Sequence, residues 1–226
     1  MRFALLRSQE IMLALELHDN YCMNITYDHN RIRVIDGFLA AADCRGFIEN
    51  FELCHRHHVR RTSDWVNLIE LELWNFTHRP AKSALHQAQM SWPYNWTEAT
   101  DQLSTKIYQA ADDYAQTWAR VNAVDLLPKD YAMEGMRIKC YRPNGLDQFR
   151  LHVDVANKGS ATRFISFLLY LNDSDGGTDF PLEGKTIEAR EGRLVLFPPL
   201  WTYPHTGIMP QDGGTKYILS TYLHYI

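Results

Sequence analysis

The second half of the chain is a succession of short segments in which apolar, β-branched and aromatic residues dominate without a helical period. Such segments, separated by turns rich in glycine, proline and asparagine, are typical of β-strands. Short strands at this spacing predict a β-sandwich or a barrel. The predicted strands cover residues 148–155, 163–171, 178–181, 193–197, 203–208 and 216–223, with a turn over residues 172–177.

The first half mixes two kinds of periodicity. Apolar residues at helical spacing predict helices over residues 3–17, 43–57 and 96–121, and alternating patterns predict strands over residues 31–35 and 68–74. No repeat or flexible linker separates the two halves. We therefore expect a single domain over residues 1–226, in which residues 1–133 form a helical and strand cover and residues 134–226 form the β core.

Composition narrows the class of protein. The chain has 226 residues, of which 46% are hydrophobic and 22% are charged, as in an ordinary globular domain. Its net charge of −4 argues against a broad nucleic-acid-binding surface, which would be basic. The four cysteines suggest no disulfide framework, and neither a signal peptide nor a membrane span is predicted. A cytoplasmic protein without a membrane partner is expected.

The predicted strand over residues 148–155 carries a His-x-Asp pair. Residues i and i+2 of a strand point to the same face, so His152 and Asp154 can direct an imidazole and a carboxylate to one point. His205 follows on a later predicted strand. Two histidines and one carboxylate on one face form the facial triad of non-haem Fe(II) oxygenases. The sequence therefore predicts an iron site with His152, Asp154 and His205 as catalytic metal ligands.

These residues belong to an ordered set of motifs over residues 134–226. The motifs are Tyr141-x-x-Asn144-Gly145, His152-x-Asp154, Tyr170-Leu171-Asn172, Gly176-Gly177-Thr178-x-Phe180-Pro181, Glu191-Gly192-Arg193-Leu194-Val195-Leu196-Phe197, Pro204-His205 and Gly214-Thr215-Lys216-Tyr217. As a set, they resemble the core of Fe(II)/2-oxoglutarate-dependent dioxygenases, nearest to the prolyl 4-hydroxylase-like group. The resemblance implies an α+β fold: a double-stranded β-helix, which is a jelly-roll or cupin-like barrel, buttressed by N-terminal helices.

The resemblance also implies cofactors and the residues that bind them. Members of the family use Fe(II), 2-oxoglutarate and O2 to hydroxylate an unactivated C–H bond, with release of succinate and CO2. Lys216 matches the cation that binds the far carboxylate of 2-oxoglutarate, although it lies about one residue further from His205 than in the family. A lysine is adequate as a point charge for one carboxylate. Tyr141 and Tyr170 match tyrosines whose hydroxyls contact the co-substrate.

The resemblance assigns fewer residues to the binding of the oxidised substrate than to the binding of the metal and 2-oxoglutarate. Arg163 matches an arginine that reaches the substrate in prolyl hydroxylases, and Tyr222 stands where many relatives place a tryptophan at the substrate mouth. The predicted loop over residues 75–96, with Trp92 and Trp96, could cover a peptide or could serve in packing. The resemblance implies hydroxylation of a prolyl residue in a peptide or protein.

Two alternatives remain open on sequence grounds. The same core could hydroxylate a free amino acid or another small molecule. The barrel could also be a non-catalytic protein that binds a metal or a ligand, although a complete triad together with Lys216 argues against this. Turnover of 2-oxoglutarate distinguishes an enzyme from a binding protein, and the identity of the oxidised molecule distinguishes the two enzymes.

Overall fold

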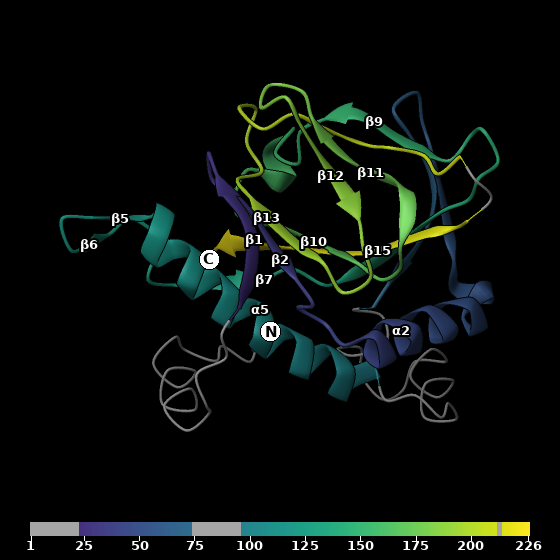
Figure 1. Ribbon diagram of the computed structural model, residues 1–226, viewed down its shortest axis with the longest axis horizontal. Coiled ribbons are helices and arrows are strands. Elements are labelled where there is room, and N and C mark those ends of the chain that lie inside the picture. Colours follow the sequence, from purple (N-terminus) through teal and green to yellow (C-terminus); the bar gives the residue numbers. More distant parts are fainter. Residues whose placement is uncertain (1–22, 74–95, 212–213) are drawn as a thin grey trace.

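The computed structural model describes residues 23–73, 96–211 and 214–226 and consists of a curled, mostly antiparallel sheet with helices on one side (Figure 1). The predicted helix over residues 3–17 and almost all of the predicted loop over residues 75–96 lie outside the described residues. Within the described residues the main sheet has 13 strands. These are β1 (Asn24–His29), β2 (Ile32–Asp36), β3 (Val59–Thr62), β4 (Val66–Glu72), β7 (Tyr131–Met133), β8 (Arg137–Tyr141), β9 (Gln148–His152), β10 (Arg163–Tyr170), β11 (Ser174–Phe180), β12 (Lys185–Ala189), β13 (Leu194–Phe197), β14 (His205–Gly207) and β15 (Lys216–Tyr225).

The strand order shows how the sheet closes on itself. Neighbouring strands follow the order β1-β2-β13-β10-β15-β8-β4-β9-β14-β11-β12, with β3 beside β4 and β7 beside β15. Strand β4 pairs with β8 and also with β9, so it links the two layers of the barrel. Strand β2 pairs with β13. The N-terminal strands are therefore part of the same sheet as the C-terminal ones.

Two long helices, α2 (Ala41–Leu53) and α5 (Trp96–Trp118), lie along one side of the barrel (Figure 1). Buried residues on α5 recur at intervals of three and four, as the sequence predicts, and pack against the outer face of the sheet. Trp96 is fully buried and its ring lies 5.9 Å from that of Phe47, so it serves in packing. Among the described residues, no helix combines the length and apolar character needed to cross a membrane.

The predicted continuation of α5 through Val121 is wrong. The helix ends at Trp118, and the chain turns into a small hairpin of β5 (Arg120–Val121) and β6 (Val124–Asp125). Its two turn residues, Asn122 and Ala123, have φ values of 50° and 63°, in the left-handed region that such tight turns require. Val121 is consequently exposed and does not extend the buried face of the helix.

The strands at the centre of the barrel are buried on both faces. On β15, Leu219 and Leu223 join the core beneath the helices, whereas Ile218 joins a second core between the layers of the barrel. Because side chains alternate along a strand, Lys216, Ser220 and Tyr222 share the inner face with Ile218. Polar groups on this inner face are withdrawn from water and therefore need partners or a function.

The glycine pair in the predicted turn over residues 172–177 lies within a strand instead. Strand β11 begins at Ser174, and its pairing with β12 shifts register between Ser174 and Thr178, as in a bulge. A Cβ atom at Gly177 would collide with the carbonyl of Ile187, and one at Gly176 would lie 2.6 Å from the carbonyl oxygen of Ile208. The two glycines allow the backbones of neighbouring strands to approach closely. From composition alone, this segment had been predicted as a turn. Strand β12 itself was missed, because only Ile187 and Ala189 face inward.

Candidate active site

The three predicted metal ligands lie together between β9 and β14. His152 and His205 are directly opposite each other in the β9–β14 pair, and Asp154 follows His152 just beyond the end of β9. Nε2 of His152 is 3.7 Å from Oδ1 of Asp154, and Nε2 of His205 is 3.9 Å from Oδ2. One potential ligand atom from each residue lies within 4.8 Å of the others, so the group could hold a metal ion.

Backbone carbonyls orient both imidazoles. Nδ1 of His152 is 2.8 Å from the carbonyl oxygen of Arg150, and Nδ1 of His205 is 3.1 Å from that of Tyr203. If each Nδ1–H donates to its carbonyl, each Nε2 presents a lone pair to the centre of the site. Burial, with a further contribution from His205, lowers the pKa of His152 to about 3, so this ring is neutral at pH 7 and free to bind a metal.

The carboxylate of Asp154 is held by two hydroxyl groups from the opposite layer of the barrel. Ser166 Oγ donates to Oδ2 at 2.6 Å, and the Tyr222 hydroxyl donates to Oδ1 at 3.0 Å. Ser166 and Tyr222 are paired across β10 and β15, which explains why they reach the same carboxylate. Burial raises the pKa of Asp154, but the two histidines and Ser166 outweigh this effect and the net pKa is lowered. The carboxylate is therefore ionised at pH 7.

Arg163 and Tyr222, which the sequence predicts at the substrate mouth, lie in one chain of contacts behind Asp154. Arg163 makes two hydrogen bonds to Glu134, at 2.6 and 2.8 Å, and a third to the backbone carbonyl of Asp154 at 3.1 Å. Its guanidinium carbon lies 3.8 Å from the centre of the Tyr222 ring. Tyr222 is only 5% exposed. Tyr222 therefore supports the carboxylate of Asp154 directly, whereas Arg163 contacts the Asp154 backbone and the Tyr222 ring.

Sequence reasoning did not find Glu134 or Ser166. Neither belongs to a recognisable motif, and each meets the site only through the register of neighbouring strands. The one available signal was a serine on an otherwise apolar strand, since Ser166 lies among the buried residues of β10. A buried hydroxyl on such a strand requires a hydrogen-bond partner, and here the partner is Asp154.

Lys216 begins β15 and is buried in the barrel, with 1% of its surface exposed. Its ammonium donates to the carbonyl of Gly177 at 3.3 Å and to the carbonyl of Ile208, and it lies 4.4 Å from the centre of the Tyr141 ring. Within the described residues, no carboxylate forms an ion pair with it. Burial lowers the pKa of Lys216 to about 7, against the opposing charge of Asp175. A buried cation without a counter-ion favours an anionic ligand.

The two predicted co-substrate tyrosines both face the barrel interior but differ in their partners. Tyr141 is paired with Lys216 across β8 and β15, and its ring lies beside the lysine ammonium. The Tyr170 hydroxyl instead donates to Thr178 Oγ1 at 2.7 Å on β11. The structure therefore brings Tyr141 and Lys216 together, whereas the Tyr170 hydroxyl is engaged by Thr178.

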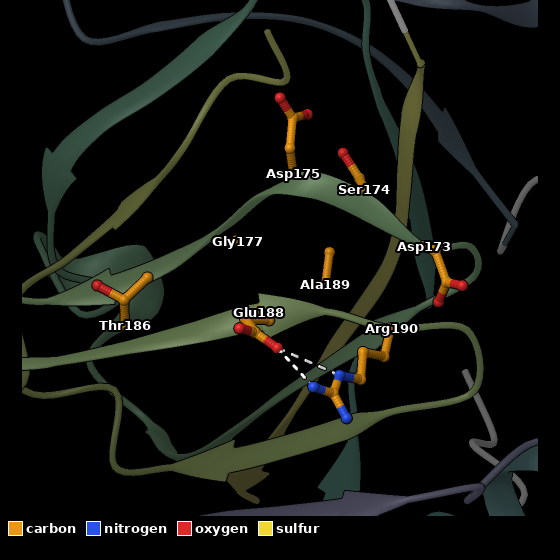
Figure 2. Close-up of a pocket in the computed structure, with 8 residues that line it drawn as sticks. All are labelled: Asp173, Ser174, Asp175, Gly177, Thr186, Glu188, Ala189 and Arg190. Atoms are coloured by element: carbon orange, nitrogen blue, oxygen red, sulfur yellow. Dashed lines mark hydrogen bonds and ion pairs between the residues drawn. The ribbon is translucent and has the colours of Figure 1, made fainter. Parts of the chain in front are cut away.

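A hollow of about 580 Å³ lies elsewhere, beside β11 and β12 (Figure 2). It is lined by Asp173, Ser174, Asp175, Gly177, Thr186, Glu188, Ala189 and Arg190. Its acids are engaged: Asp173 and Asp175 accept backbone amides, and Glu188 accepts from Arg190, as Figure 2 shows for the last pair. No member of the His-Asp-His group lines this hollow, so we place the chemistry in the barrel interior.

Comparison with known proteins agrees with this geometry. Residues 136–224 match the family model described as the 2OG-Fe(II) oxygenase superfamily. No curated protein sequence matches the chain.

Solved structures resemble the chain over most of its length. A viral collagen prolyl hydroxylase from Paramecium Bursaria Chlorella virus-1, in complex with 2OG, has a TM-score of 0.60 and 17% identity, over 89% of this chain and 99% of the viral one. A prolyl hydroxylase from Trichoplax adhaerens, in complex with a hypoxia inducible factor peptide fragment, has a TM-score of 0.62 and 15% identity, over 87% of this chain and 84% of the other. A Pseudomonas putida prolyl-4-hydroxylase has a TM-score of 0.55 and 17% identity, over 88% and 94%.

These likenesses confirm the predicted double-stranded β-helix with its two supporting helices. The matched segment contains His152, Asp154, His205 and Lys216. Fe(II), 2-oxoglutarate and O2 are the cofactor and co-substrates that the superfamily implies. Together, the sequence match over residues 136–224, the fold and the His-Asp-His group make the chain similar to 2-oxoglutarate-dependent non-haem iron dioxygenases of the 2OG-Fe(II) oxygenase superfamily, with a prolyl 4-hydroxylase-like fold.

Proposed function

We propose that the protein hydroxylates a prolyl residue of a peptide or protein and converts 2-oxoglutarate to succinate and CO2. The observation that carries this proposal is the polar content of the barrel interior. A His-Asp-His group suited to a metal faces the same interior as Lys216, a buried lysine that forms no ion pair among the described residues. Such a pair of sites suits a metal-bound dicarboxylate, and the prolyl hydroxylases of similar fold support the choice of substrate.

The proposed metal ligands are His152, Asp154 and His205. A neutral imidazole, an ionised carboxylate and a second imidazole are a donor set that Fe(II) accepts and that leaves coordination positions open. When bound, Fe(II) with 2-oxoglutarate and O2 supplies the oxidising power that replaces a C–H bond by a C–OH bond. The protein's part is to hold the reactants in place and to keep water away from them.

Lys216 is the proposed partner of the far carboxylate of 2-oxoglutarate. Its ammonium is held by two carbonyl groups and by the Tyr141 ring, so it is already oriented before a ligand arrives. A carboxylate would balance the charge of the ammonium and form a charge-assisted hydrogen bond with it. Apolar side chains such as Ile218 and Phe197 line the same core and exclude water from it.

Ser166 and Tyr222 are proposed as positioning residues. Each donates to one oxygen of Asp154, so the carboxylate cannot rotate without losing a hydrogen bond. Arg163 packs on the Tyr222 ring and is itself fixed by Glu134. Outer contacts of this kind orient metal ligands and raise the affinity for the metal.

Two exposed tryptophans in segments that contact the site suit a peptide. The Trp65 ring lies 6.2 Å from that of His152 and is 47% exposed. Trp201 is 77% exposed, in the loop where the carbonyl of Pro199 accepts from the amide of Val155, directly after the proposed carboxylate ligand. Exposed aromatic rings are common anchors of peptide and protein contacts. We propose that a peptide lies across them, with its prolyl ring towards the metal.

Mass spectrometry of candidate substrates tests the proposal. The Fe(II)-loaded protein is incubated with 2-oxoglutarate, O2 and a panel of proline-containing peptides, free L-proline and other amino acids, and His152→Ala serves as the control. We expect at least one proline peptide to gain one oxygen atom and to increase succinate formation. If a free amino acid gains the oxygen and no peptide does, the small-molecule alternative replaces the peptidyl one.

A further inference from the structure

A second buried lysine, Lys139, lies on the inner face of the barrel. It is on β8, two residues before Tyr141, and is only 7% exposed. Among the described residues, no hydrogen bond or ion pair to its ammonium is present. The ammonium lies 5.3 Å from the centre of the Phe149 ring. A cation–π contact compensates only part of the hydration that a buried ammonium loses.

Lys139 forms no ion pair within the described part of the chain, although an acid lies next to it. Glu70 is directly opposite Lys139 in the β4–β8 pair. The Glu70 carboxylate is 3.3 Å from Arg61 and 3.9 Å from Arg137, and it forms no ion pair with Lys139. An opposite charge in the partnered position would ordinarily be the partner of a structural lysine. Because Glu70 does not form this ion pair, we infer that the Lys139 ammonium is directed elsewhere.

The direction is towards the metal centre. The Phe149 ring, over which the ammonium lies, stacks on the ring of His152 with centroids 3.5 Å apart and an interplanar angle of 7°. Lys139 therefore approaches the proposed iron site across one aromatic ring. Burial lowers the pKa of Lys139, against the opposing charges of Glu70 and Asp154, and an anion bound there would favour the charged form.

A second unsatisfied group faces the same space. Ser220 is fully buried and its hydroxyl has no hydrogen-bond partner among the described residues. Lys139 is paired with Ile218 across β8 and β15, and Ser220 is the next inward-facing residue along β15. A buried ammonium and a buried hydroxyl on adjacent strands are thus both available to one ligand, separate from Lys216 at the start of β15.

We propose that Lys139, assisted by Ser220, is a second anion-binding site in the barrel and binds a carboxylate beside the metal centre. This carboxylate belongs either to the metal-proximal end of 2-oxoglutarate or to the molecule that is oxidised. The second source would make that molecule a free acid, such as an amino acid, or the C-terminal residue of a peptide. The inference rests on the proposed function for the nature of these ligands.

Binding measurements with Lys139→Met, Lys139→Arg and the exposed control Lys158→Met test the proposal. Calorimetry with the Mn(II)-loaded proteins gives the affinity for 2-oxoglutarate. A second titration into the Mn(II)–2-oxoglutarate complex uses L-proline and other free amino acids, with their amides as controls that lack the carboxylate. We expect Lys139→Met to weaken one of these carboxylate ligands by about tenfold or more, and Lys139→Arg to restore most of the loss.

The titration that changes identifies the source of the carboxylate. Unchanged affinity of Lys139→Met for 2-oxoglutarate, with no amino acid whose binding depends on its carboxylate and on Lys139, would overturn the proposal. Thermal unfolding of the metal-free proteins separates binding from stability: removing a buried unpaired charge should leave the midpoint equal or higher. A lower midpoint in Lys139→Met would show a structural lysine and also overturn it. Because no readout uses turnover, failure of the proposed hydroxylation is a separate result.

Discussion

Two ends of the barrel interior can be compared: the metal end, with His152, Asp154 and His205, and the lysine end, with Lys216. They differ in how many of their polar groups have hydrogen-bond or ionic partners within the described residues. At the metal end, both oxygens of Asp154 accept hydrogen bonds from hydroxyl groups, and both imidazoles are oriented by carbonyls. At the other end, the Lys216 ammonium has carbonyls and an aromatic ring around it but no negative charge within ion-pair distance in the described part of the chain.

This difference indicates what each end binds. The metal end is pre-organised, with ligand atoms facing one another, and so suits a cation. The lysine end carries a buried ammonium whose desolvation is only partly offset by two carbonyls and an aromatic ring, and so suits an anion. A ligand that coordinates a metal at one end and carries a carboxylate at the other would satisfy both, and 2-oxoglutarate is such a ligand.

The largest expected effect comes from removing a metal ligand. His152→Ala deletes one of three proposed ligands, and we expect Fe(II) or Mn(II) binding to become undetectable by calorimetry. Circular dichroism should show an intact fold, because His152 lies at the end of β9. His224→Ala, which changes a histidine far along β15, is the matched control and should bind metal normally. Normal metal binding by His152→Ala would remove His152 from the site.

A smaller effect should follow from removing the charge at the lysine end. Lys216→Met loses a charge-assisted hydrogen bond of about 1.5–3 kcal/mol, so we expect 2-oxoglutarate to bind about 10- to 150-fold more weakly. Metal affinity should not change, since Lys216 is not a ligand. Titration of the Mn(II)-loaded protein measures both quantities, with Lys158→Met as the exposed control. An unchanged affinity for 2-oxoglutarate would assign the anchor to another cation.

Removing one hydrogen bond to Asp154 should lower the affinity for the metal less than removing a metal ligand does. Tyr222→Phe removes the donor to Oδ1 and leaves the Ser166 bond to Oδ2. We expect metal affinity to fall about tenfold, at the lower end of the range for outer contacts of metal ligands. Tyr225→Phe, a change at a half-exposed tyrosine, should have no effect. If Tyr222→Phe lowered the affinity of the metal-free protein for 2-oxoglutarate by the same factor, the role of Tyr222 would not be confined to Asp154.

The lysine end should also show a pH dependence. The pKa of Lys216 is lowered to about 7 by burial, so in the ligand-free protein the ammonium loses its proton as pH rises above about 7. A bound carboxylate favours the protonated form, so binding takes up a proton, and affinity should fall by about tenfold per pH unit above pH 7. Below pH 7 it should be level. Lys216→Arg stays charged and should flatten the profile; a profile equally steep in this variant would exclude Lys216 as the cause.

Local patterns were enough to predict much of the fold and the metal end. The periodicity of α5 and the apolar runs of β10 and β13 indicated helix and buried strands, because each depends on near neighbours. His152 and Asp154 are two residues apart, so strand geometry nearly places them together. The hairpin after Trp118 was not predicted, because Val121 continues the apolar spacing of the helix. In the structure, the left-handed turn residues Asn122 and Ala123 reverse the chain there.

Contacts that depend on register could not be predicted in the same way. Ser166, Tyr222 and Glu134 meet behind Asp154 only because β10, β15 and β7 are aligned as they are. In the sequence, Lys139 looks like any lysine in an alternating strand. Its burial follows from closure of the barrel by β4, which lies far away in the chain.

We propose that one ligand joins the two ends of the barrel and is converted there. Succinate formation from 2-oxoglutarate, measured at rising co-substrate concentration in the Fe(II)-loaded protein, tests it most directly when Lys216→Met and His152→Ala are assayed alongside. We expect the unaltered protein to form succinate, and Lys216→Met to reach the same rate of succinate formation only at high 2-oxoglutarate concentration. His152→Ala should form no succinate at any concentration. Succinate from His152→Ala, or the same 2-oxoglutarate requirement in Lys216→Met as in the unaltered protein, would contradict binding of one ligand at both ends.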